Sequence, residues 1–466
     1  MIAMTTKSST SVKANRRFPV VEFKACPLRF HDAFCKHVVR LRNHYNRKRC
    51  CCTVEFVWHG IHLTIGQRIA RQATEQSPNT QFRIASFNRA TIFQADITNM
   101  LKNATTETVT STEPALRTVT TIDQFEQLRD AWDELTSDPL LSFAWHFSWW
   151  NSFQHLGQLQ LFVLEANGQV VGIAPFFLDR WGGQRRLRFL GSGKTCTDFA
   201  DLIVADGWRD RLVEEIAVHI VESMAMLELE GVTVDEPQKS FNQQLGSRFW
   251  RYDIELEPSW MLDLPDQWSD FMSGSKKSLK RKIKKAEKRL ASDEFEIRTT
   301  LEDLPLDEGW KLLVELHQSR FQSKDMAGAF SDANFEQFLY DAVTMLDEKE
   351  QAEIVVAYHE GEPIGVHLIL LGSSGPQLYQ SGIQMAKAKS EPGHLLITFE
   401  VRRAIEQGHS MFDFLRGNEP YKPYWGAVPH RLQSIRFVSR SAIPTMLNQG
   451  FCLLKKLKRK VATSKA

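Results

Sequence analysis

The 466-residue sequence lacks several features that define whole classes of protein. No stretch approaches 18 consecutive apolar residues, which excludes a membrane-spanning helix. The opening segment has no apolar core of signal-peptide length, so secretion is not indicated. Only seven cysteines are present, and their uneven spread argues against a disulfide-stapled extracellular fold. Together these absences favour the cytoplasm as the compartment.

Positive charge and cysteine are concentrated at the start of the chain. Residues 1–99 carry a net charge of +11 and five of the seven cysteines, whereas residues 100–466 carry a net charge of −9. The whole chain, with 42% hydrophobic and 24% charged residues, has the composition of a globular protein. Its length favours at least two domains. We therefore expect residues 1–110 to form a basic extension that is poorly ordered or not translated, with the true start near Met100.

The basic extension leaves more than one role open. Its Lys and Arg patches are typical of an arm that binds nucleic acid or a membrane surface, or of a segment that packs little. Cysteines 50–52, His59 and His62 are candidate metal ligands, but adjacent cysteines cannot all reach one ion, and structural zinc needs two separated ligand pairs. We therefore predict no metal site there, and only a strand within residues 51–65.

The rest of the chain contains an internal duplication. Residues 163–178 align without gaps with residues 356–371, which lie 193 positions later, and the alignment pairs Gly168 with Gly361. The asparagine before Gly168 is a strong signal for a β-hairpin. Each copy is preceded by a helical stretch and followed by another strand. Repetition of a whole unit predicts an α/β fold with mixed sheets, built as two tandem domains.

We expect the first domain at 115–262, the second at 263–445 and a basic tail at 446–466. The second copy continues with a strand, a loop, a helix and a strand, over residues 376–384, 386–393, 394–408 and 410–417. Two parallel strands joined by a helix form a βαβ unit, which places the loop at the N-terminus of the helix. Free backbone N–H groups and the helix dipole favour a phosphate group at that position.

Three motifs carry a resemblance to a known family: FLGSGKTCTDFADLIV at 189–204, SKKSLKRKIKKAEKRL at 275–290 and, most specific, FDFLRGNEPYKPYWGA at 412–427. With them, residues 115–440 resemble the CelD-like (cellulose-biosynthesis) acyltransferases, which consist of two GNAT-type domains and are related to the FemAB peptidyltransferases. The resemblance implies two GNAT folds with a cleft between them. It also implies transfer of an acyl group from acetyl-CoA or another acyl-CoA to an amine or hydroxyl of a cell-envelope or polysaccharide precursor.

The donor loop departs from the pattern of that superfamily. Acyl-CoA GNAT enzymes usually carry R/Q-x-x-G-x-G/A for the pyrophosphate, whereas KSEPGHLL keeps only Gly393 and has Leu395 where a second small residue is expected. We still assign Gly393, His394 and Leu395 to the donor. The departure leaves room for an aminoacyl-tRNA donor, as the Fem relatives use, and for a non-catalytic binding protein.

Three residues of the last motif are candidate catalytic groups. Asp413 alternates with apolar residues along its strand, which suits a general base with a raised pKa or a partner of Arg416 or Lys422. Tyr421 and Lys422 follow in a loop punctuated by Gly and Pro. The tyrosine is suited to protonating a leaving thiolate, and the lysine to holding a phosphate or an oxyanion. Otherwise Tyr421 covers the sheet and Lys422 is solvated; the resemblance favours a functional Lys422.

The second motif predicts an intensely basic amphipathic helix. Residues 276–289 hold nine Lys and Arg, interleaved with apolar residues at helical spacing. Its outer face is either solvated or a site for a polyphosphate, a nucleotide-sugar, tRNA or an anionic lipid. Lys280 and Lys284 lie off the apolar stripe and are the predicted anion-binding residues. The same face is a candidate for peripheral membrane contact.

Three further residues are candidates for binding the acceptor. Asp198 and Asp201 follow a Gly-Ser-Gly turn near the end of a strand. They are suited to binding an amine or hydroxyls, or to capping a helix. His367 pairs with Ala174 of the first copy and faces either the cleft or the interior.

Overall fold

The computed structural model describes residues 113–440, apart from three short gaps, together with Met446, Gly450 and the backbone of three earlier strands. The gaps are 224–225, 234–237 and 323–325. By its internal contacts the chain divides into two compact units, residues 1–105 and 106–466.

The first unit contains a three-stranded antiparallel sheet with β2 in the centre. Its strands are β1 (Val39–Asn46), β2 (Arg49–Trp58) and β3 (Ile61–Arg68). The single strand predicted at residues 51–65 is therefore wrong in extent: this stretch belongs to two antiparallel strands, β2 and β3. The side chains of the candidate metal ligands, the proposed start at Met100 and almost all of the tail lie outside the described residues, so those hypotheses stay predictions.

The second unit consists of two halves, each with helices before the duplicated hairpin and a further helix and strand after it. The elements of the first half are β4 (Ala115–Val119), α2 (Ile122–Glu126), α3 (Arg129–Leu135), η1 (Pro139–Leu141), α4 (Phe143–Phe153), η2 (Gln154–Leu156), β5 (Gln158–Leu159), β6 (Leu161–Ala166), β7 (Gln169–Ala174), β8 (Phe176–Trp181), β9 (Gln184–Phe189), β10 (Ile203–Val204), α5 (Arg209–Ser223), β11 (Met226–Thr233), α6 (Gln238–Leu245) and β12 (Phe249–Glu255).

The elements of the second half are β13 (Ser259–Asp263), α7 (Trp268–Gly274), α8 (Lys277–Leu290), β14 (Phe295–Thr299), α9 (Leu306–Gln322), η3 (Ala329–Ser331), α10 (Ala333–Asp347), β15 (Ala352–His359), β16 (Glu362–Gly372), β17 (Gly375–Ile383), η4 (Met385–Ser390), α11 (Pro392–Glu406), β18 (Met411–Arg416), α12 (Tyr421–Trp425), β19 (Val428–His430) and β20 (Leu432–Ser439).

These strands form three sheets. Their orders are β10-β7-β6-β4, β12-β20-β11-β9-β8-β5 and β14-β15-β16-β17-β18-β13-β19. Each of the two larger sheets contains one parallel pair, β9 with β11 and β17 with β18, among antiparallel neighbours. The expected α/β fold with mixed sheets is thereby confirmed, as is the βαβ unit made of β17, α11 and β18.

The duplicated hairpins share their turn conformation and their β-bulge. The turn residues Asn167 and Gly168 have positive φ angles of 53° and 77°, and Glu360 and Gly361 have 54° and 76°. Each hairpin carries a β-bulge at the equivalent position, 164/165 in the first copy and 357/358 in the second. These shared irregularities support descent of both halves from one unit.

A second pair of equivalent glycines explains why the hairpin sequence recurs. A Cβ at Gly172 would lie 3.1 Å from a Leu212 side-chain carbon of α5. A Cβ at Gly365 would lie 2.8 Å from Pro392, at the start of α11. In each half the missing side chain lets the following helix lie close against the sheet.

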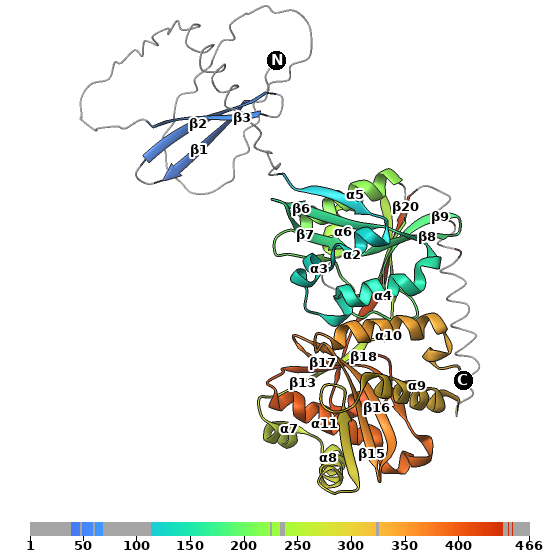
Figure 1. The fold of residues 1–466 in the computed structure, drawn as a ribbon. Helices are drawn as coiled ribbons and strands as arrows, with labels where there is room; N and C mark the ends of the chain where they lie inside the picture. Colours follow the sequence, from blue (N-terminus) through green and yellow to red (C-terminus); the bar gives the residue numbers. More distant parts are fainter. Residues whose placement is uncertain are drawn as a thin grey trace, which may run out of the picture. The chain divides into compact units, whose positions relative to one another are not determined.

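The chain does not divide cleanly at the predicted boundary between residues 262 and 263. That boundary falls inside β13, which pairs with β18 and β19 of the second half. The last strand, β20, instead pairs with β11 and β12 of the first half (Figure 1). The second half therefore supplies an inner strand to the sheet of the first half, and long-range ladder hydrogen bonds tie the halves together.

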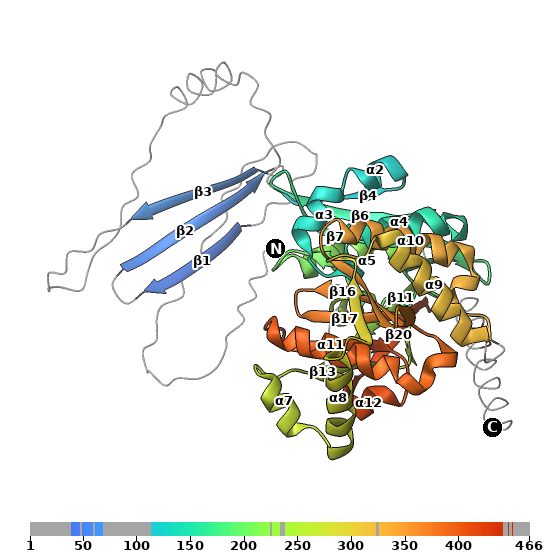
Figure 2. The same ribbon diagram turned by 60° about the horizontal axis from the view of Figure 1, so that its bottom comes forward.

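Helices cover both faces of the seven-stranded sheet: α7, α8 and α11 lie over one face, and α9 and α10 over the other (Figure 2). The aromatic residues 143–153 form α4, which packs against α10 across the two halves. Trp145 of α4 and Phe338 of α10 meet edge to face with ring centroids 4.9 Å apart. This contact places α4 and α10 beside the region where both halves meet.

Candidate active site

A cavity of about 300 Å³ lies between the two halves, where the parallel strands β17 and β18 part. The two strands share a single paired position, Gln377 with Asp413, and diverge beyond it. Residues beyond that pair line the cavity from both strands, and the 194–198 segment closes it from the first half. The side chains that line the cavity include those of Asp198, His317, Tyr379, Arg416, Tyr421 and Lys422.

Asp198 and Arg416 form a buried ion pair across the two halves. Nε of Arg416 donates a hydrogen bond of 2.8 Å to Oδ1 of Asp198, whose side chain is only 1% exposed. Oδ2 of Asp198 accepts no hydrogen bond from a described residue. Burial raises the pKa of Asp198, although Arg416 opposes that rise. The predicted acceptor residue Asp198 therefore lines the cavity, and its buried Oδ2 has hydrogen-bonding capacity that no described residue uses.

Tyr379 fixes the loop that carries Asp198. Its hydroxyl donates a 2.7 Å hydrogen bond to the carbonyl of Thr195, and its ring meets Trp145 edge to face. Trp145 in turn donates to the hydroxyl of Thr197 at 2.9 Å. These contacts order the loop from both halves and hold Asp198 in place. Sequence reasoning did not find Tyr379, because nothing local distinguishes it from other strand tyrosines.

Lys422 belongs, like Arg416, to the motif at residues 412–427, but its ammonium group does not face solvent. Its side chain is 2% exposed. Nζ donates to the carbonyls of Leu415 and Arg416, each at 3.0 Å, and pairs with Glu419 at 2.9 Å. With these partners, the ammonium group stabilises the turn that presents Arg416. The geometry favours a positioning role, and the predicted direct role on the donor stays a prediction.

Asp413 supports the same turn from the strand. Its Oδ1 accepts hydrogen bonds from the Leu415 N–H at 2.7 Å and from the Ser259 hydroxyl at 3.1 Å. Leu415 adopts a left-handed backbone conformation with φ 53°, which is uncommon for a leucine and which the first of these bonds stabilises. The expected partners of Asp413 donate to other groups: Arg416 to Asp198, and Lys422 to the Leu415 carbonyl. Burial raises the pKa of Asp413 to about 7.

The raised pKa of Asp413 gives a pH-dependent contribution to stability. The folded protein keeps this proton up to about pH 7, whereas the unfolded chain loses it near pH 4. The free energy of unfolding should therefore fall as the pH rises from 4 to 7, by at most about 4 kcal/mol. Asp413→Asn should lack that fall. Urea unfolding of both proteins across this pH range measures the difference. An equal dependence of the free energy of unfolding on pH in both proteins would show that ionisation of Asp413 does not destabilise the fold.

Two more side chains of the cavity have shifted pKa values. Burial raises the pKa of Tyr421 well above its usual range, so its hydroxyl stays protonated and can donate a hydrogen bond. Burial lowers the pKa of His317 to about 4, so this ring is uncharged at neutral pH. His317 comes from α9, far from the motifs that sequence analysis used, and no pattern in that helix marks it.

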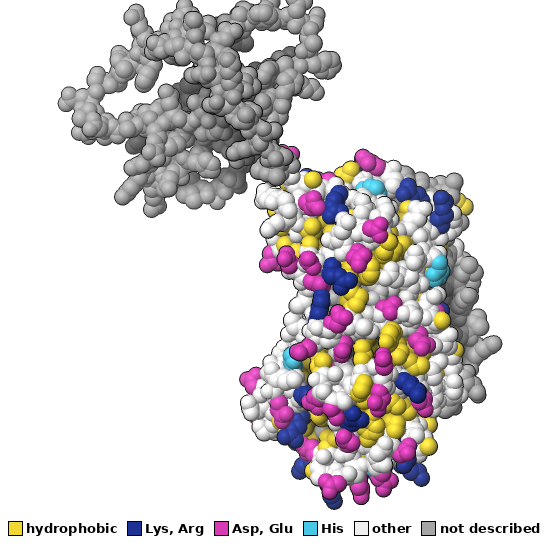
Figure 3. Space-filling model, in the orientation of Figure 1, with side chains coloured by type: hydrophobic (Ala, Val, Ile, Leu, Met, Phe, Trp, Pro, Cys, Tyr) yellow, Lys and Arg dark blue, Asp and Glu magenta, His cyan; other side chains and the backbone are white. Residues whose placement is uncertain are grey.

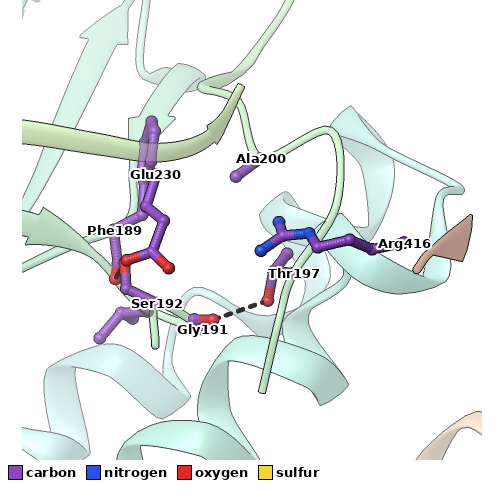
Figure 4. A pocket seen from close by; sticks show the side chains of 8 residues that line it. Phe189, Gly191, Ser192, Thr197, Ala200, Glu230 and Arg416 are labelled. Carbon is purple, nitrogen blue, oxygen red and sulfur yellow. Dashed lines mark hydrogen bonds between the residues drawn. The ribbon is translucent and has the colours of Figure 1, made fainter. Parts of the chain in front are cut away.

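The equivalent position in the first half is closed. The parallel strands β9 and β11 pair over three residues and then part, as β17 and β18 do. The volume between them that a water molecule could enter is about 0 Å³. Thr197, which donates to the Gly191 carbonyl at 3.0 Å, and the guanidinium of Arg416 fill it (Figure 4). Of the two duplicated positions, only the one in the second half is open.

The predicted donor residues lie at the start of α11, with different surroundings. Gly393 lies in the first turn, and a Cβ there would meet no atom within 4 Å. His394 packs against Tyr424 and Trp425. Leu395 is 1% exposed and belongs to the core, so its side chain does not face a ligand.

The two predicted lysines of α8 do not face α11. Lys280 donates to the Ser273 carbonyl at 2.8 Å, and Lys284 is exposed. The helix itself and its buried apolar stripe agree with the prediction. The cations that reach the start of α11 are Lys282, Lys285 and Arg289. Which lysines of a helix face a neighbour depends on tertiary packing, so sequence could not choose between them.

Asp201 and His367 do not line the cavity. Asp201 forms a two-pronged ion pair with Arg209 at 2.8 and 2.6 Å. His367 is buried, and its Nδ1 lies 2.9 Å from the carboxylate of Glu400 on α11. Of the three predicted acceptor residues, the structure brings only Asp198 to the cavity.

Residues 274–423 match the family model of the acetyltransferase (GNAT) domain. The chain contains a GNAT acetyltransferase domain. The matched region includes β17, α11, β18 and most of α12, and so holds the second-half wall of the cavity. This match identifies the protein as an acyltransferase but does not distinguish a CelD-like subfamily. No curated protein matches the chain.

Several solved structures are similar to this chain. FemX is 13% identical, with 69% of this chain and 96% of FemX covered and a TM-score of 0.48. A tandem GNAT protein from the clavulanic acid biosynthesis pathway is 13% identical, with coverages of 71% and 99% and a TM-score of 0.38. The C-terminal domain of a putative lysylphosphatidylglycerol synthetase from Agrobacterium fabrum is 7% identical, with coverages of 71% and 97% and a TM-score of 0.45. Similarity at this level says nothing about the substrates of this chain.

The described residues contain neither a metal-binding cluster nor a membrane-spanning helix. No group of three or more His, Cys, Asp or Glu side chains in residues 113–440 is arranged to hold a metal ion. Within the same part of the chain, every helix is too short or too polar to cross a bilayer.

Proposed function

We propose that this protein transfers an acyl group from acyl-CoA, in the cavity between β17 and β18, to an amine or hydroxyl of a cell-envelope or polysaccharide precursor. The observation that carries the proposal is the parting of these two parallel strands inside the GNAT domain, with a cavity of about 300 Å³ at their carboxyl ends. Ligands of α/β sheets bind in such crevices at the carboxyl ends of strands.

The donor is proposed to bind along β17. This strand carries a β-bulge in which Tyr379 has no partner on β16, since Leu368 pairs with Gln380 and Ile369 with Leu378. The backbone groups of a bulged residue lie outside the ladder. The N–H of Tyr379, which lies outside this ladder, is suited to donating a hydrogen bond to the thioester oxygen as negative charge develops on that oxygen.

The acceptor is proposed to enter from the side of the first half. Oδ2 of Asp198 takes a proton from the attacking amine or hydroxyl as the new bond to the acyl carbon forms and the carbon–sulfur bond breaks. The protonated hydroxyl of Tyr421 donates a hydrogen bond to the leaving sulfur. Arg416 holds Asp198, and Lys422 with Asp413 hold the turn of Arg416.

Calorimetric titration with acetyl-CoA tests the donor, and mass spectrometry of mixtures with amino sugars and amino acids tests the transfer. We expect micromolar affinity and one donor per chain, because the equivalent position in the first half is closed. Two equal sites per chain would contradict the assignment of the two halves.

The exposed basic face of α8 supports a second candidate, transfer from an aminoacyl-tRNA. Tight, salt-sensitive binding of tRNA without binding of acetyl-CoA would favour that donor. Binding of neither would favour a non-catalytic protein.

A further inference from the structure

Three cations of α8 converge on one carboxylate at the start of α11. Lys285 lies 2.7 Å from Oε2 of Glu391, Arg289 lies 3.7 Å from the same oxygen, and Lys282 pairs with Oε1. Arg289 also donates to the carbonyl of Ser390. On the face that Figure 3 shows, acidic and basic side chains are interspersed. The convergence of three positive charges on a single negative one is therefore a local feature.

One carboxylate does not neutralise this cluster. Three cations against one anion leave an excess of two positive charges, to which the dipole at the start of the 15-residue helix α11 adds. The pKa of Lys285 is lowered, first by desolvation and then by Arg289 and Lys282. A phosphate group or a diphosphate, with two or more negative charges, matches the cluster better than the carboxylate of Glu391 does.

The cluster lies next to the proposed donor path. β17 leads from the cavity into η4, and Glu391 follows η4 directly as the residue that caps α11. Glu391 adopts a left-handed conformation with φ 54°, which is uncommon outside glycine. Its side chain is 21% exposed, so solvent and ligands can reach the ion pairs. The space beside Gly393 is open as well.

We propose that Glu391 is an internal competitor of the donor: its carboxylate occupies, between α8 and α11, the place that a donor phosphate takes when Glu391 leaves. Lys282, Lys285 and Arg289 then become ligands of that phosphate. This inference rests on the proposed acyl-CoA function for the identity of the donor. It assigns to Glu391 control of donor affinity. No position of the glycine-rich R/Q-x-x-G-x-G/A donor loop has that role.

The test is calorimetric titration of the full chain and of Glu391→Gln with CoA, pantetheine and inorganic pyrophosphate. Removal of the competing charge should tighten CoA and pyrophosphate binding about tenfold, the summed effect of several partly exposed ion pairs. Binding of pantetheine, which lacks the diphosphate, should not change. Lys285→Ala and Arg289→Ala should weaken CoA and leave pantetheine unaffected.

Matched controls and a second readout keep the result interpretable. Lys284→Ala and Lys288→Ala remove exposed charges from the same helix and should change CoA affinity less than twofold. Melting curves with and without pyrophosphate detect the same effect without activity, since a ligand that binds the folded state raises the melting temperature. The rise should be larger for Glu391→Gln than for the unaltered protein.

Equal CoA affinity of the unaltered protein and Glu391→Gln would overturn the inference and leave the proposed function intact. Equal gains for pantetheine and CoA would also overturn it, because they would place the effect away from the phosphates. Tighter pyrophosphate binding by Glu391→Gln, with no acetyl-CoA binding by either protein, would support the anion site and refute the acyl-CoA function.

Discussion

Asp198→Asn is expected to reduce the turnover of acyl transfer by about 10²–10³-fold, because the amide cannot take the proton of the attacking acceptor. The amide oxygen can still accept the hydrogen bond from Arg416, so the loop keeps its shape. Donor-dependent product formation, measured by mass spectrometry well below the melting temperature, gives the turnover. Binding of acetyl-CoA should be unchanged, since the donor is assigned to the other half of the cavity.

Asp201→Asn is the matched control for this variant. Asp201 lies three residues further on and pairs with Arg209 away from the cavity. Its replacement should cost at most about 1 kcal/mol of stability and leave turnover within a factor of two. Normal turnover of Asp198→Asn, or an equal loss in both variants, would refute the role of Asp198 as the base.

Lys422→Ala is expected to lower the free energy of unfolding by about 3–5 kcal/mol, since it leaves the buried carbonyls of Leu415 and Arg416 without their donor. Turnover should fall as well, because the turn that presents Arg416 loses its support. Urea unfolding and product formation measured side by side give both effects. Lys194→Ala, which removes a highly exposed lysine at the rim of the cavity, should change stability by less than about 1 kcal/mol.

The combination of results separates two roles for Lys422. A stable Lys422→Ala protein with strongly reduced turnover would mean that the ammonium acts on the donor, as the sequence motif alone suggests. Loss of stability together with turnover would support the positioning role that its contacts indicate. Normal values of both would contradict each role.

Local sequence patterns were sufficient for the repeated unit. The Asn-Gly turn at Gly168, its counterpart at Gly361 and the order strand, loop, helix, strand are encoded by neighbouring residues, and the structure reproduces them. Even so, the apolar residues within 123–136 have the spacing of one continuous helix, whereas the structure breaks this stretch into α2 and α3. No Gly or Pro marks that break in the sequence.

Long-range pairing was beyond prediction. The pairing of β20 with the sheet of the first half depends on contacts between segments about 200 residues apart, which no local periodicity encodes. For the same reason the sequence indicated Asp198 and Lys422 but not what each contacts. The partnership of Asp198 with Arg416 joins two motifs 218 positions apart. Membership of a motif indicated these residues as candidates, and tertiary packing determines which groups each of them contacts.

Hydrogen–deuterium exchange of the full chain with and without acetyl-CoA tests most directly whether the parted strands of the second half are the donor site. Protection is expected at residues 378–381 of β17 and 414–417 at the end of β18, which line the cavity. The corresponding residues 189–192 and 228–230 of the first half should exchange at the same rate in both states, because that position is closed. Protection confined to the first half, or no protection in either half at saturating acetyl-CoA, would contradict this assignment.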